Sequence, residues 1–232
     1  MAIFRKELRE YRHNGPVIAT MAIIPLVFMI QPLVNVLALG TSASVPLSKE
    51  HVLLYLLGIP AIVPAVVAAY SVVGERQQAT LEPVLSTPIR REELLLGKAL
   101  ASFVPSIAVA YAVYVLFLFI VELFADRAVA SALIRGPDLL AQVIFTPLLA
   151  ALSIWIGMGI SARSKDARVA QQLGTVGSLP AVIVVALIAL NVIQATLGLA
   201  LIAIVALLVL DAVGWRITSA AFDRERLITG TK

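Results

Sequence analysis

The sequence predicts an all-α, polytopic membrane protein with six transmembrane helices. Three observations lead to this prediction. Hydrophobic residues make up 60% of the 232 positions, charged residues make up only 14%, and the mean hydropathy is +0.98. A soluble domain of this length needs far more polar surface to cover its core. Several apolar runs also exceed the roughly 20 residues with which a helix crosses a bilayer core of about 30 Å.

Six apolar windows alternate with polar connections, and each window is long enough to span a bilayer. They are expected at residues 17–39, 52–73, 95–121, 139–161, 175–191 and 195–214. The last two windows are separated by so few residues that we expect a tight or re-entrant helical hairpin between them. The whole chain, 1–232, is expected to form a single transmembrane domain, with a cytoplasmic tail at 215–232.

The positive charges predict the orientation of the spans. Of the 18 Lys and Arg residues, all but three lie in the N-terminal segment, in the second-to-third and fourth-to-fifth connections, and in the C-terminal tail. The exceptions are Lys49, Arg127 and Arg135. Because Lys and Arg are enriched in cytoplasmic loops, we expect both termini to be cytoplasmic. The expected location is the plasma membrane, or inner membrane, of the cell, with multiple passes.

The N-terminal segment, residues 1–15, has the pattern of an amphipathic helix. Phe4, Leu8 and Tyr11 fall on one helical stripe, and four basic residues lie largely opposite. A helix of this kind lies in the headgroup plane of the membrane, with its cations toward anionic lipid. The alternative is an ordinary positively charged flank of the first span.

The connection between the second and third spans divides into two helical pieces. The first piece, at about 75–86, is short and amphipathic. Ser86, Thr87 and Pro88 then interrupt it. Thr87 can cap a new helix that has Pro88 at its first position and continues into the third span. A short helix held across the ends of two spans would present a rigid knob to a soluble partner.

This connection, residues 74–98, resembles the cytoplasmic signature of the permease subunits of ABC type-2 exporters. The matching positions are Glu75, Arg76, Thr80, Leu81, Glu82, Leu85, Thr87, Pro88, Ile89, Gly97 and Lys98. Gln77 stands where that family often has Glu, and Ala79 where it usually has Gly. The alternative is a solvated loop whose charges serve only to set the membrane topology of the flanking spans. Such a loop would not require Thr-Leu-Glu followed by Thr-Pro at this offset.

The resemblance implies a division of labour between subunits. Residues 75–86 would be the coupling helix that docks on a separate ABC ATPase subunit, and residues 1–15 would be the connecting helix near that subunit. The residues that would couple to the ATPase are Glu75, Arg76, Thr80, Leu81, Glu82, Leu85, Thr87 and Pro88. Two permeases, identical or paralogous, would pair with spans one, two and five near their interface. ATP and magnesium are expected in the ATPase, and no cofactor in this chain.

The chain shows no catalytic motif of its own. Gly97-Lys98 lacks the preceding glycine of a phosphate loop, and the lysine is followed by alanine rather than Ser or Thr. Cysteine is absent, and the two histidines, His13 and His51, are expected on opposite membrane faces. We therefore expect no catalytic residue and no metal site. The expected surroundings are the lipid bilayer and protein partners, not nucleic acid.

Polar residues within the spans are candidates for lining a transport pathway. The candidates are Gln31, Asn35, Gln142, Thr146, Asn191, Gln194 and, at the outer end of the third span, Glu122. Each could equally hydrogen-bond between helices, which is worth about 1 kcal/mol. Asp211 is expected near the inner end of the sixth span, where it could meet Arg216 or interfacial water. The scarcity of central charge favours an amphiphilic or lipid-like cargo over a small ion.

The sequence therefore favours one function over two others. The favoured function is the permease of an ATP-driven exporter. A stand-alone carrier or channel would need no ATPase, and the lack of a central carboxylate argues against an ion-driven carrier. An intramembrane enzyme, such as a lipid transferase, has no supporting motif.

Overall fold

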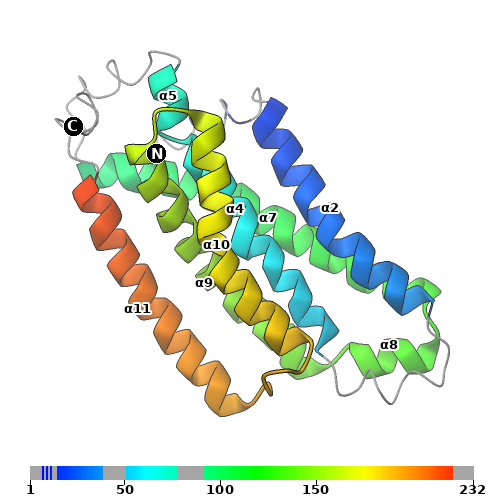
Figure 1. The fold of residues 1–232 in the computed structure, drawn as a ribbon. Coiled ribbons are helices and arrows are strands. Elements are labelled where there is room, and N and C mark those ends of the chain that lie inside the picture. The colour runs from blue at the N-terminus through cyan, green and yellow to red at the C-terminus, as the bar shows by residue number, and fades with distance from the viewer. Residues whose placement is uncertain are drawn as a thin grey trace.

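The fold is a bundle of helices, described by a computed structural model for residues 7, 9, 11, 15–38, 51–77 and 91–221 (Figure 1). Six of its helices are long and apolar enough to cross a membrane, which confirms the predicted number of spans. They are α2 (Gly15–Leu37), η2 (Val52–Leu57) continuing into α4 (Gly58–Tyr70), α7 (Arg91–Phe124), α9 (Gly136–Arg163), α10 (Ala167–Ala189) and α11 (Leu197–Ala221). Two shorter helices are α5 (Val73–Gln77) and α8 (Arg127–Leu133). The described residues include no strand.

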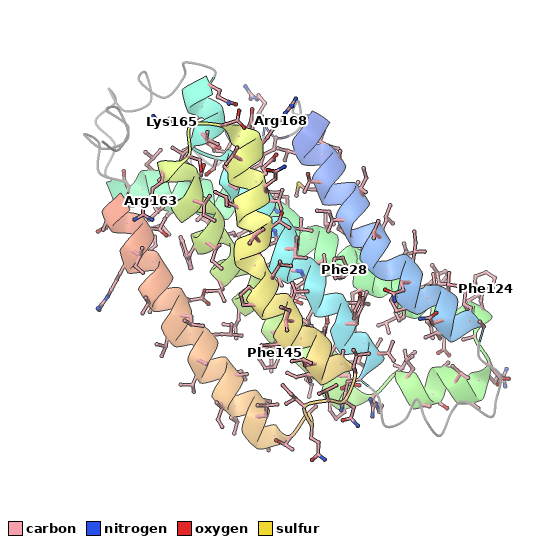
Figure 2. All side chains as sticks on the ribbon, viewed as in Figure 1. Phe28, Phe124, Phe145, Arg163, Lys165 and Arg168 are labelled. Atoms are coloured by element: carbon pink, nitrogen blue, oxygen red, sulfur yellow. The ribbon has the colours of Figure 1, made fainter. Side chains whose placement is uncertain are left out.

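The bundle has two distinct ends. Figure 1 shows α5, the start of α2 and the end of α11 at one end, which we call the α5 end. The opposite end carries α8 and the link between α10 and α11, and we call it the α8 end. Arg163, Lys165 and Arg168 gather at the α5 end (Figure 2). The described helix ends that flank the basic connections therefore share one end of the fold.

Several helices extend beyond the spans expected from hydropathy. α7 has 34 residues and is thus about 51 Å long, more than the hydrocarbon core requires. α10 begins at Ala167 rather than near residue 175, because Asp166 caps it. The Asp166 carboxylate accepts hydrogen bonds from the backbone N–H groups of Arg168 and Val169, at 2.8 and 3.1 Å. Charge and hydropathy alone miss such a cap.

The link between α10 and α11 is a tight turn. Asn191 adopts a left-handed conformation, with φ of 56°, which asparagine tolerates better than most residues. The N–H of Val192 donates back to the carbonyl of Leu187 at 2.9 Å. Thr196 then caps α11, its hydroxyl accepting from the N–H of Leu199 at 3.2 Å. Both helices are long enough to span a membrane separately.

α4 occupies the centre of the bundle. Figure 1 shows it between α2 and α10, and every residue from Gly58 to Ala69 is buried. α11 lies at the periphery, and Thr218 is its one buried residue. A helix that is apolar all round suits a fully buried position. The second span is therefore the core around which the other spans pack.

Small residues let α9 and α10 approach the α4 backbone closely. A Cβ atom added at Gly157 of α9 would collide with the carbonyl oxygen of Ala65, and one at Gly174 of α10 would lie 3.2 Å from the same oxygen. The hydroxyl of Ser153 donates to the carbonyl of Ala61 at 2.5 Å. Small and hydroxyl-bearing residues are the usual means by which membrane helices pack tightly. Here they fix α4 against two neighbours at once.

This packing predicts that Gly157→Ala destabilises the protein. The added methyl group meets a backbone oxygen, which cannot rotate away, so we expect a loss of about 1–3 kcal/mol. Thermal denaturation in detergent, followed by size-exclusion chromatography, measures the shift in melting temperature. Gly198→Ala is the matched control, because a Cβ atom there meets nothing within 4 Å. Equal melting temperatures for the two variants would contradict the packing described.

Candidate functional site

A buried cluster of three charged side chains lies at the α5 end of the bundle. The Lys98 ammonium contacts the carboxylates of Glu7 and Glu75 at 2.6 and 2.8 Å. It also donates to the backbone carbonyl of Ser71 at 2.8 Å. The Lys98 side chain is fully buried, and both glutamates are nearly so. We call Glu7, Glu75 and Lys98 the inner charge cluster.

The cluster joins three segments that are distant in the sequence. Lys98 comes from the first two turns of α7, Glu75 from α5, and Glu7 from the N-terminal segment. Ser71 adds the C-terminal cap of α4. The cluster therefore ties the start of the third span to the end of the second and to the segment that precedes the first.

α9 sets the position of Glu75. The chain breaks its helix between α4 and α5, which frees the backbone N–H groups of Val72 and Val73. Both donate to the hydroxyl of Ser161, each at 3.1 Å. Because a buried N–H without a partner is costly, Ser161 stabilises the break and directs α5. Glu75 thus reaches Lys98 from a backbone held by another span.

The N-terminal segment contacts α7 at two successive points. Glu7 pairs with Lys98, and the hydroxyls of Tyr11 and Ser102 lie 3.2 Å apart. In both segments the contacting residues are four apart, which is the spacing of one helical face. Glu7 and Tyr11 are buried while Arg9 is exposed. The described part of this segment thus turns one side toward the bundle.

The inner charge cluster contains two carboxylates and one ammonium group. Buried charges are tolerated when they are paired and hydrogen-bonded, and removing one partner from such a group costs several kcal/mol. Lys98 is the shared partner of both glutamates. The geometry therefore makes Lys98 the residue on which the contact between the three segments depends.

The residues expected to couple to an ATPase lie at or beyond the edge of the described chain. Glu75 belongs to the inner charge cluster, and the backbone of Arg76 lies in α5. The other six lie outside the described residues: Thr80, Leu81, Glu82, Leu85, Thr87 and Pro88. Residues 78–90 connect α5 to α7, and both of these helices contribute to the cluster. The cluster therefore lies at the base of the connection that carries the signature.

The residues expected to line a pathway do not form one site. Gln31 and Asn35 are exposed on α2, where Gln31 accepts a hydrogen bond from the hydroxyl of Tyr55 at 3.2 Å. Gln142 is instead buried inside the bundle. Glu122, Asn191 and Gln194 are exposed toward the α8 end. Among the described residues, no hydrogen bond joins any two of these six.

A second, partly buried charge cluster lies at the α8 end, and no pattern in the sequence predicted it. The Asp138 carboxylate contacts His51 Nδ1 at 2.7 Å and Arg135 Nη2 at 2.9 Å. The backbone N–H of His51 also donates to the backbone carbonyl of Ala189 at 3.2 Å. We call Asp138, His51 and Arg135 the outer charge cluster. It holds together the ends of the second, fourth and fifth spans.

Asp211 lies deeper in its helix than expected. α11 continues to Ala221, so Asp211 lies about 15 Å before the end of the helix. No ion pair with Arg216 forms within the described part of the chain. Of the two partners expected for Asp211, Arg216 is therefore not paired with it in the described part of the chain.

The inner charge cluster predicts that Lys98→Met destabilises the protein by about 3–5 kcal/mol, since it leaves two buried carboxylates without their cation. Thermal denaturation in detergent measures the loss. Lys165→Met removes an exposed lysine at the same end and serves as the control. Glu75→Gln added to Lys98→Met should restore part of the stability by removing one of the two buried carboxylates that lost Lys98. A double variant no more stable than Lys98→Met would contradict this arrangement.

Comparison with known proteins identifies the family of the chain. The family model described as "ABC-2 family transporter protein" matches residues 1–218. This match includes all six spans, the inner charge cluster and the connection at 78–90. No curated protein shows a significant match to the chain. The chain is a multi-pass transmembrane permease that belongs to the ABC-2 transporter family.

Proposed function

We propose that this chain is the membrane-spanning half of an ATP-driven exporter whose ATPase is a separate subunit. The observation that carries the proposal is the inner charge cluster at the base of the connection at 78–90. At this cluster the chain receives movement from the ATPase subunit and does not generate the movement itself. ATP and magnesium bind to the ATPase, and this chain supplies the path through the membrane.

The cluster gives a physical route from a soluble partner into the bundle. A displacement of the connection at 78–90 moves α5 and α7, between which it lies. Because Lys98 is bonded to Glu75, Glu7 and the Ser71 carbonyl, these elements and the N-terminal segment move as one body. α4 then carries the movement to α9 and α10, with which it is closely packed. Discrete shifts of packed helices are the usual form of such changes.

The orientation that we propose for the protein in the membrane follows from the distribution of charge. Arg163, Lys165 and Arg168 lie at the α5 end, as do the helix ends that flank the other basic connections. Enrichment in Lys and Arg favours the cytoplasmic side. The ATPase would then meet the α5 end of the bundle from the cytoplasm of a cell with this chain in its plasma or inner membrane. Both termini would be cytoplasmic.

A second permease copy would cover the exposed side of α2. Gln31 and Asn35 are exposed there beside Tyr55, within a span that is otherwise largely apolar. Exposed amides at membrane depth are poorly solvated by lipid tails. A partner helix, or a pathway between the two copies, would satisfy them. The neutral amide and phenol groups suit an amphiphilic or lipid-like cargo, and we expect no cofactor.

Reconstitution tests the coupling. The chain is co-purified with an ABC ATPase that binds it, and ATP hydrolysis and movement of a fluorescent lipid analogue are measured in liposomes. Glu75→Gln should lower transport about tenfold or more while leaving most of the ATP hydrolysis, because it weakens a buried ionic contact worth at least 1.4 kcal/mol. Glu82→Lys should weaken ATPase binding itself. Glu92→Gln, at an exposed position of α7, is the control.

Two outcomes would reject the proposal. One is full coupling after residues 78–88 are replaced by a flexible linker of equal length. The other is gradient-driven flux through liposomes that contain this chain and no ATPase, which would identify a stand-alone carrier or channel.

The arrangement of the dimer is tested by cross-linking, since the chain contains no cysteine of its own. Val34→Cys on α2 should form a disulfide-linked dimer under mild oxidation in membranes. Val205→Cys on α11 is a matched control, because Val34 is 59% exposed and Val205 is 61% exposed. Cross-linking through α11 rather than α2 would contradict the proposed dimer, because it would place the second copy against α11.

A further inference from the structure

A row of polar residues enters the bundle from the α8 end along one face of α9. Asp138, Gln142 and Thr146 are spaced four residues apart, so they lie one below another on that face. All three are buried: Gln142 is 1% exposed and Thr146 is fully buried. Thr146 lies about 15 Å along α9 from Gly136, close to half the thickness of a bilayer core. The row therefore brings polarity deep into the membrane-spanning part.

α7 covers this row with two tyrosines. The hydroxyl of Tyr111 donates to the carbonyl of Val143 at 3.0 Å, which fixes the register between α7 and α9. Tyr114, one turn further toward the α8 end, is 6% exposed. The buried polar row of α9 and the tyrosines of α7 thus lie along the same contact between the two helices, beneath the outer charge cluster.

Several polar atoms in this region lack partners in the described part of the protein. Neither the oxygen nor the nitrogen of the Gln142 amide has a hydrogen-bond partner among the described residues, and neither does the Tyr114 hydroxyl. Each such buried group costs about 1–3 kcal/mol if it stays unsatisfied. Asn and Gln amides can always both donate and accept. A ligand that satisfies the Gln142 amide must therefore both donate and accept hydrogen bonds.

The charges of the region select the chemistry of that ligand. Asp138 is already paired with His51 and Arg135, and Gln142 and Tyr114 are neutral. A cation would find no free carboxylate among these residues, and an anion would find Asp138 beside it. The ligand is therefore neutral, small, and able to donate and accept hydrogen bonds.

We propose that Gln142 and Tyr114 form a buried hydration site in which ordered water bridges the Gln142 amide and the Tyr114 hydroxyl beneath the outer charge cluster. Buried waters commonly make two to four hydrogen bonds, and these groups supply three polar atoms. His51 and Arg135 are partly exposed, 18% and 27% at their side chains, so the site lies next to the aqueous face of the α8 end. This inference does not depend on an ATPase or a cargo.

Radiolytic hydroxyl labelling of the full chain in detergent tests the site, because radicals formed from bound water oxidise the side chains beside it. The two tyrosines Tyr114 and Tyr11 are 6% and 4% exposed, and Tyr11 already has Ser102 as its partner. Mass spectrometry should show Tyr114 labelled several times faster than Tyr11. Gln142→Leu should lower Tyr114 labelling about threefold or more by displacing the water. Gln172→Leu, an exposed position of α10, should leave it unchanged.

The melting temperature of the Gln142→Leu variant provides a second test of the hydration site. If water joins Gln142 to Tyr114, Gln142→Leu leaves the tyrosine hydroxyl without a partner and lowers the melting temperature. If the region is dry, the same change removes two unsatisfied atoms and raises the melting temperature. Tyr114 labelling no faster than that of Tyr11, or a higher melting temperature for Gln142→Leu than for Gln172→Leu, would overturn the proposal.

Discussion

The close approach of α9 and α10 to the backbone of α4 is the constraint on which the rest of the bundle depends. In a membrane, apolar side chains gain little by moving from lipid into protein, so helices associate through tight packing and hydrogen bonds. Gly157 and Gly174 provide the tight packing at Ala65, and Ser153 provides the hydrogen bond at Ala61. These contacts define a central span and leave α11 as a peripheral one.

The two charge clusters act on this core from opposite ends. At the α5 end, Lys98 joins segments that come from both sides of the connection at 78–90. At the α8 end, Asp138 joins the ends of three spans through His51, Arg135 and the backbone of Ala189. The inner cluster is nearly dry, so its ion pairs hold geometry more firmly than exposed pairs would. The outer cluster is partly exposed through His51 and Arg135. The bundle is thus fastened at its ends and closely packed at its centre.

Much of the fold could be predicted from the sequence, because hydropathy and charge report directly on membrane crossing. The six spans and the clustering of basic residues at one end followed from those two properties. The helix ends did not, since they depend on caps such as Asp166 that hydropathy ignores. Likewise, Gly157 carried no signal before α4 was known to lie against it.

The charge clusters were harder to predict for a different reason. The sequence shows Lys98 as a basic residue of a cytoplasmic connection and as a match to the family signature, but not that the fold buries it completely. Its partners Glu7 and Glu75 lie far away in sequence, and only the packing of α4, α7 and the N-terminal segment brings them together. The spacing of Glu7 to Tyr11 and of Lys98 to Ser102 offered a faint signal. Gln142 is a pathway candidate from its polarity, and the structure adds that it is buried within the bundle.

The central position of α4 has a consequence for how the protein is made. Gly157 follows Ala65 by about 90 residues, so at about 5–20 residues per second α4 leaves the ribosome roughly 5–18 s before its main neighbour. During that interval it has α2 and then α7 beside it, and otherwise only lipid. A helix with a polar face for α9 would be poorly solvated while it waits. The all-apolar surface of α4, with the hydroxyls placed on the later helix, lets the core span remain in the bilayer until its partners arrive.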